Sequence, residues 1–103
     1  MPAILKDEDL ETRWIAALRS GAYRKCTGAL TRGGSSRCAL GVLCDEANIG
    51  YSYKELRPLF IDQEDVSTIE RLNDQLRYSF ITIAHYIELP LRSYLSATYV
   101  RRP

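Results

Sequence analysis

Three cysteines and one histidine are the residues that could hold a metal ion. They are Cys26, Cys38, Cys44 and His85. Structural zinc sites usually place two cysteines roughly two to four residues apart, whereas gaps of eleven and five residues separate these cysteines. An odd number of cysteines and the lack of an export signal at the start of the sequence indicate free thiols in a reducing cytoplasm. We therefore expect no metal site and small, buried cysteine side chains.

Cys44, Asp45 and His85 form the one set of side chains that suggests nucleophilic catalysis. A nucleophile needs a base held within hydrogen-bond distance and oriented by a third group. The histidine lies far from the cysteine in sequence, and no other motif supplies an acid, a base or a metal. The sequence predicts a protein that is not an enzyme and needs no cofactor.

Basic residues gather in one part of a chain whose formal net charge is only +1. Between Glu11 and Asp45 there is no acidic residue, but there are six basic ones. Glycine amides beside basic side chains commonly hold phosphate groups, although the segment GALTRGGSS lacks the Gly-Lys-Ser/Thr ending of a P-loop. The candidate binding residues here are Tyr23, Arg24, Lys25, Arg32 and Arg37. The alternative is that these side chains are solvated, or pair with the acidic segment 62–74.

Asn73 and Asp74 are further candidate binding residues, at the end of a predicted helix. Short polar side chains at such a position usually bond to nearby backbone and shape the turn that follows. We favour this structural interpretation over a ligand-binding one.

The C-terminal part of the sequence supports two other interpretations. Tyr86, Tyr94 and Tyr99 lie close together in sequence, and tyrosine is enriched in interfaces, so this end is a candidate homodimer contact. The same region also fits a helix-turn-helix, with the turn at 88–90 and a recognition helix over 91–102. The candidate DNA-binding residues of that alternative are Arg92, Ser93, Ser96, Arg101 and Arg102.

The periodicity of apolar residues predicts the elements that position these groups. Helices are expected over Asp7–Ser20, Ala39–Asn48, Ser52–Leu56, Ser67 to about Gln75, from Ser79 through Ile87, and from Pro90 onward. Two extended runs, Lys25–Leu30 and Ser36–Ala39, are joined by a glycine turn and predict a small β-hairpin at about residues 24–38. At 103 residues, 46% of them hydrophobic, the chain suits one domain spanning 1–103. The predicted class is α+β, mostly α-helical, with five to six short helices and one hairpin.

Two local signals make this prediction more specific. Ser67 and Glu70 have the spacing of a capping box, which would start a helix at Ser67 with Leu76 on its apolar stripe. In the first helix, Trp14 shares a stripe with Leu10 and Leu18. We expect this tryptophan to be buried against the helix at 40–47 and against residues 80–83. No apolar run reaches the length of a membrane span.

Four blocks of the sequence together resemble a family of small uncharacterised proteins from tailed bacteriophages and prophages. The blocks are WIAALRSGAYRKCTGAL, RCALGVLCDEANIG, RLND and SFITIAHYIE, in order from Trp14 to Glu88. Arg37 stands where the family pattern has the first of two cysteines, Ala39 shifts the following leucine, and the glycine after Leu-Asn-Asp is missing. The resemblance implies a viral accessory protein in the cytoplasm of a bacterial host. Such a protein would bind and modulate a host protein or complex, or a phosphate-bearing ligand, as an anti-defence or host-takeover inhibitor.

Overall fold

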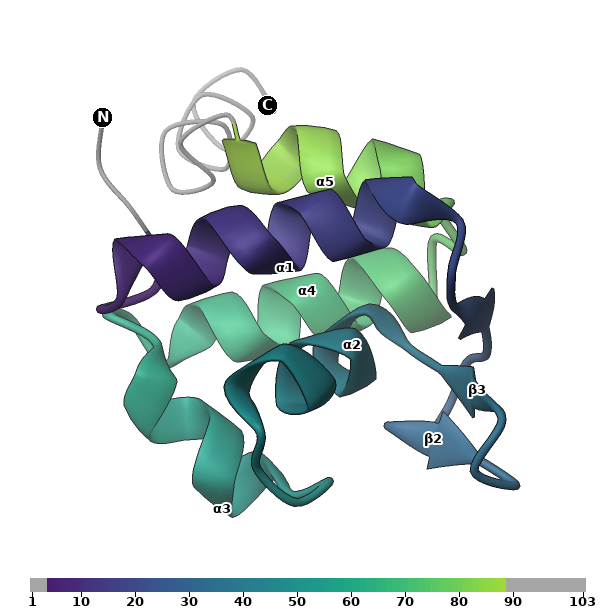
Figure 1. Ribbon diagram of the computed structural model, residues 1–103, viewed down its shortest axis with the longest axis horizontal. Helices are drawn as coiled ribbons and strands as arrows, with labels where there is room; N and C mark the ends of the chain where they lie inside the picture. The colour runs from purple at the N-terminus through teal and green to yellow at the C-terminus, as the bar shows by residue number, and fades with distance from the viewer. Residues whose placement is uncertain (1–3, 89–103) are drawn as a thin grey trace, which may run out of the picture.

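The computed structural model describes residues 4–88, which form a helical body with a small sheet at one end (Figure 1). The helices are α1 (Glu8–Ser20), α2 (Ala39–Ala47), α3 (Tyr53–Leu56), α4 (Glu64–Asp74) and α5 (Phe80–Glu88), with the 3₁₀ helix η1 (Arg57–Leu59). The strands are β1 (Arg24–Lys25), β2 (Thr31–Arg32) and β3 (Ser36–Arg37). The predicted mostly helical α+β class is confirmed. The helix expected from Pro90, with Tyr94, Tyr99 and the candidate DNA-binding residues Arg92, Ser93, Ser96, Arg101 and Arg102, lies outside the described residues.

Helix α1 forms as its apolar stripe predicts. The Asp7 carboxylate accepts a hydrogen bond from the Leu10 N–H at 3.1 Å, which caps the helix, and Gly21 ends it with φ +76°. Trp14 is completely buried, and its indole N–H donates to the carbonyl of Ala39 at 2.9 Å. Helix α1 packs against both α2 and α5, so its apolar stripe lies at the centre of the core.

Helix α2 is the most deeply buried element. All residues from Ala39 to Cys44 are buried, including Gly41. A Cβ atom at Gly41 would lie 1.9 Å from the carbonyl oxygen of Leu30, so only glycine lets the helix approach the loop before β2 this closely. Asn48 ends the helix in the left-handed conformation, with φ +56°.

The predicted hairpin is wrong in one strand. Only Lys25 of the predicted run from Lys25 to Leu30 belongs to a strand. The chain leaves the sheet after β1 and enters it again at Thr31 as β2, so three short strands form in the order β1-β3-β2. Strands β2 and β3 are the antiparallel hairpin, and β1 pairs with β3 in parallel. Gly28, with φ +79°, lies in the connection between β1 and β2, where the chain changes direction and extended structure cannot continue.

The predicted start of α4 is also wrong. The helix begins at Glu64, so Ser67 lies inside its first turn and the capping box does not form. The earlier start is caused by Asp62, whose carboxylate accepts from the Glu64 N–H at 2.9 Å. Leu76 follows the end of the helix and is half exposed instead of joining the stripe.

The remaining helices agree with the predicted boundaries. The Ser79 hydroxyl accepts from the Thr82 N–H at 3.2 Å and caps α5, whose apolar side chains are buried. Helix α3 ends at Leu56, as expected before Pro58, although the chain continues through this proline as the 3₁₀ helix η1.

Candidate functional site

The register of the sheet sorts its side chains into two rows. Arg24 and Arg32 both pair with Ser36, and Lys25 and Thr31 both pair with Arg37. Because residues directly opposite each other on neighbouring strands point to the same face, each set of three lies on one face. We call Arg24, Ser36 and Arg32 the outer row, and Lys25, Arg37 and Thr31 the inner row.

The side chains of the inner row form hydrogen bonds and an ion pair within the protein. The Arg37 guanidinium pairs with the Asp45 carboxylate at 2.8 Å, and it also donates to the Thr31 hydroxyl at 3.1 Å. It lies over the ring of Tyr51, 5.0 Å from the ring centroid, and the Tyr51 hydroxyl donates to the same carboxylate at 2.6 Å. The hydrogen bond to Asp45 raises the pKa of both Arg37 and Tyr51. These contacts hold Arg37 against α2, so it is not available to a ligand.

Lys25 and Tyr23 are similarly engaged. The Lys25 ammonium donates to the carbonyl of Asn73 at 3.1 Å, which joins β1 to the end of α4. The Tyr23 hydroxyl faces the carboxylate of Glu46 at 3.5 Å, and partial burial raises the pKa of this tyrosine. Two further predicted binding residues therefore have structural partners.

The two arginines of the outer row have no ion-pair partner among residues 4–88. Arg24 and Arg32 are both exposed. The Nε of Arg32 donates to the carbonyl of Thr27 at 2.8 Å. A Cβ atom at Gly28 would lie 2.9 Å from Nη2 of Arg32, so the guanidinium lies directly over this glycine. The backbone thus fixes the Arg32 side chain without neutralising its charge.

Asn73 holds three parts of the chain together. Its side chain is buried, accepts from the Ala39 N–H at 3.1 Å and donates to the Cys26 carbonyl at 3.0 Å. It also donates to the Asp74 carboxylate at 2.7 Å. These bonds connect α4 to the start of α2 and to the end of β1, and they favour the structural interpretation of both residues.

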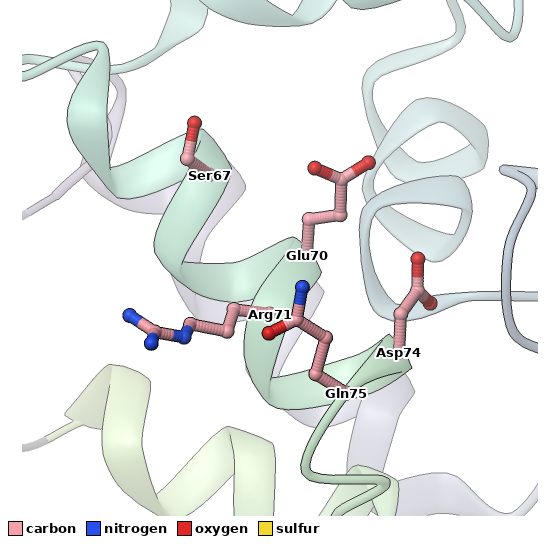
Figure 2. A pocket seen from close by; sticks show the side chains of 5 residues that line it. All are labelled: Ser67, Glu70, Arg71, Asp74 and Gln75. Carbon is pink, nitrogen blue, oxygen red and sulfur yellow. The ribbon is translucent and has the colours of Figure 1, made fainter.

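A shallow hollow of about 480 Å³ lies along α4, lined by Ser67, Glu70, Arg71, Asp74 and Gln75 (Figure 2). The two carboxylates point to one side of the helix and the arginine to the other. Glu70 accepts a hydrogen bond from the Tyr53 hydroxyl at 2.6 Å, and burial together with this bond raises the pKa of Tyr53. Because all five lining residues belong to α4 or its C-cap, the hollow is a surface depression and does not enclose a ligand.

The chemistry-bearing residues do not assemble into a reactive set within the described part of the chain. Cys38 and Cys44 are buried, and burial raises the pKa of each thiol to about 11. His85 is exposed on α5. Among residues 4–88, no three His, Cys, Asp or Glu side chains lie where they could hold a metal ion.

We expect the thiols to differ in reactivity toward iodoacetamide. At pH 8 a thiol with a pKa of about 11 is roughly 0.1% thiolate, so Cys38 and Cys44 should stay unmodified while the partly exposed Cys26 reacts. The raised pKa favours the protonated folded form. The stabilisation from the two buried thiols is therefore present below about pH 9 and decreases as the pH rises toward 11. Mass spectrometry of the labelled native protein, with the denatured protein as control, measures the order of reaction. Equal labelling of Cys44 and Cys26 in the native protein would contradict the buried position of Cys44.

Part of the chain is similar to one family of known proteins. Residues 6–48, from the residue before the α1 cap to the end of α2, match a family described as a domain of unknown function, DUF8296. The search of curated proteins and the search of solved structures each find no match. No helix among residues 4–88 has the length and apolar character needed to cross a membrane.

Proposed function

We propose that this chain is a phage-encoded accessory protein that binds and modulates an anionic component of its bacterial host, in the host cytoplasm. The observation that supports the proposal is the outer row, where two exposed arginines lie on one face of the sheet, on either side of β3, without a carboxylate partner among the described residues. The phage origin is an inference from the four-block resemblance. The modulating role follows from that origin, because a small viral domain of this kind would act on a host molecule.

The electrostatics of the sheet give the binding role its physical basis. Neighbouring strands lie about 4.8 Å apart, so the Cα atoms of Arg24 and Arg32 are separated by about 10 Å across β3. Two like charges at this distance repel each other slightly in water. An anion placed between them relieves that repulsion and accepts charge-assisted hydrogen bonds from both guanidinium groups.

Reversing the charge of the outer row is expected to abolish partner binding and leave the fold intact. Arg24→Glu with Arg32→Glu changes exposed side chains, which usually alters stability by no more than about 0.5 kcal/mol per site. Lys54→Glu with Arg57→Glu is the matched control, because these basic residues are also exposed but lie on α3 and η1.

The measurement is capture from a host lysate by each tagged protein, together with its melting temperature. The proposal predicts that the unmodified protein and the control capture the same host component and that the outer-row variant does not. Capture of the same component by the outer-row variant, at an unchanged melting temperature, would show that another surface binds it.

The helix-turn-helix interpretation remains a prediction. Its first helix corresponds to α5, in which Ala84 is buried as that motif requires, but its turn and recognition helix lie outside the described residues.

A further inference from the structure

We infer that the anionic component is a nucleic acid, held by its phosphodiester backbone across the outer row of the sheet. This inference rests on the function proposed above and narrows it to one class of partner. It uses Arg24 and Arg32 on the sheet, a surface separate from the C-terminal residues of the helix-turn-helix interpretation.

The open shape of the sheet favours a polymer over a small phosphate ligand. Arg24, Arg32 and the turn residues Gly33, Gly34 and Ser35 are all exposed. Small ligands bind in concave sites that cover most of their surface, and the hollow that the structure describes lies on α4, lined by that helix and its C-cap alone. An extended chain of phosphates can instead follow an open face, because each phosphate needs only one or two contacts.

The composition of the same face favours a nucleic acid over an acidic protein. Stable protein–protein interfaces have an apolar centre, whereas nucleic-acid interfaces are more polar and much more positively charged. The large apolar side chains exposed among residues 4–88 are Tyr51, Ile61, Leu76 and Ile81. None of them belongs to a strand or a turn of the sheet, and Tyr51 contacts the inner row through Arg37. Ser36, between the two arginines, is buried and its hydroxyl donates to the Arg32 carbonyl. The outer row therefore offers the charge and the hydrogen-bond donors of its two arginines without an apolar centre.

The geometry of Arg32 suits a phosphate contact. Its Nε is bonded to the Thr27 carbonyl, so the side chain is ordered before a ligand arrives, and its exposed Nη groups remain available as donors. Gly28 acts as a positioning residue, because any side chain there would displace the guanidinium. The Cα atoms of Arg24 and Arg32 are separated by about 10 Å, so two long arginine side chains can reach phosphates of the same strand. One strand can thus contact both arginines.

Fluorescence anisotropy with labelled nucleic acid tests this inference on the full chain. The probes are a 16-base-pair DNA duplex and a 16-nucleotide single strand, each titrated at several salt concentrations. Arg24→Gln with Arg32→Gln removes two phosphate contacts. The slope of log K against log salt is negative, and this double variant should make it shallower, by about 1.8 for the duplex or about 1.4 for the single strand. The matched control, Lys54→Gln with Arg57→Gln, should leave the slope unchanged.

Three outcomes would overturn the inference. The unmodified protein could fail to bind either probe even at low salt. The slope could be unaffected by the outer-row variant but reduced by Arg101→Gln with Arg102→Gln, which would place the nucleic-acid contacts in the C-terminal residues. Free nucleoside triphosphate could compete at matched ionic strength as well as an equal concentration of oligonucleotide, which would indicate a small phosphate ligand. In each case, loss of the captured host component in the charge-reversed variant would still support the proposed function, because that experiment does not depend on the nature of the anion.

Discussion

Replacing Trp14 by alanine is expected to lower the free energy of unfolding by about 3–5 kcal/mol, the usual cost of removing a large buried aromatic side chain. The indole is completely buried and meets the ring of Phe60 edge to face, with 6.1 Å between the centroids. Its N–H also bonds to the Ala39 carbonyl, so the substitution removes the link between α1 and the start of α2. A domain of this size has only about 5–15 kcal/mol of total stability, and the variant should therefore be partly unfolded at 37 °C.

Two further variants separate the contributions of Trp14. Trp14→Phe keeps an aromatic ring against Phe60 but loses the hydrogen bond, so we expect it to cost less than the alanine variant. Ile81→Ala is the control for hydrophobic truncation, because Ile81 is 63% exposed and should have little effect. Urea denaturation followed by circular dichroism measures all three. A loss for Trp14→Ala no larger than that for Ile81→Ala would show that Trp14 is not part of the core.

Replacing Gly41 by alanine is expected to destabilise the protein by about 3 kcal/mol, at the upper end of the usual cost of overpacking. Alanine is favoured over glycine in the interior of an isolated helix by about 1 kcal/mol, so helix propensity alone predicts the opposite sign. Packing decides the outcome here, because the new Cβ would lie 1.9 Å from the Leu30 carbonyl oxygen. The Leu30 carbonyl group and the Cβ atom of Arg37 both lie close to this position, so α2 can accommodate the methyl group only by moving away from them.

Ala16→Gly in α1 is the matched control for Gly41→Ala. Ala16 is exposed in the middle of its helix, so the change to glycine should cost about 1 kcal/mol through propensity alone. Both substitutions should therefore lower the melting temperature, although they are opposite in chemistry. A higher melting temperature for Gly41→Ala would mean that α2 does not lie against the Leu30 carbonyl.

The helices could be predicted from the sequence because each of their signals is local. Leu10, Trp14 and Leu18 mark the buried face of α1 by their spacing alone, and Ser79 marks the start of α5 in the same way. The start of α4 was misplaced because two polar residues, Asp62 and Ser67, could both begin a helix, and the structure uses the earlier one. The contact between Trp14 and Phe60 was missed because these residues are far apart in sequence and Phe60 lies outside any helical stripe.

The basic segment could be recognised from the sequence, but its division into two rows could not. Arg24 and Lys25 are equivalent as neighbouring positive charges, and only strand pairing sends them to opposite faces. A shift of one residue in the register would exchange the two rows, and the sequence of such short strands does not fix the register. The parallel pairing of β1 with β3 was missed for the same reason, since it depends on a connection whose path is set by tertiary contacts.

We expect the side-chain hydrogen bonds of Asn73 to influence when the sheet forms during folding. They span 34 residues to Ala39 and 47 residues to Cys26, and long separations of this kind close slowly because the intervening chain must first lose entropy. The block matched by the family, residues 6–48, contains all three strands found among residues 4–88 but not this amide. We therefore expect this block to be a unit of sequence similarity and not one that folds on its own. On the same basis, we expect the outer row to reach its final position only after the chain has been made and folded as far as the end of α4.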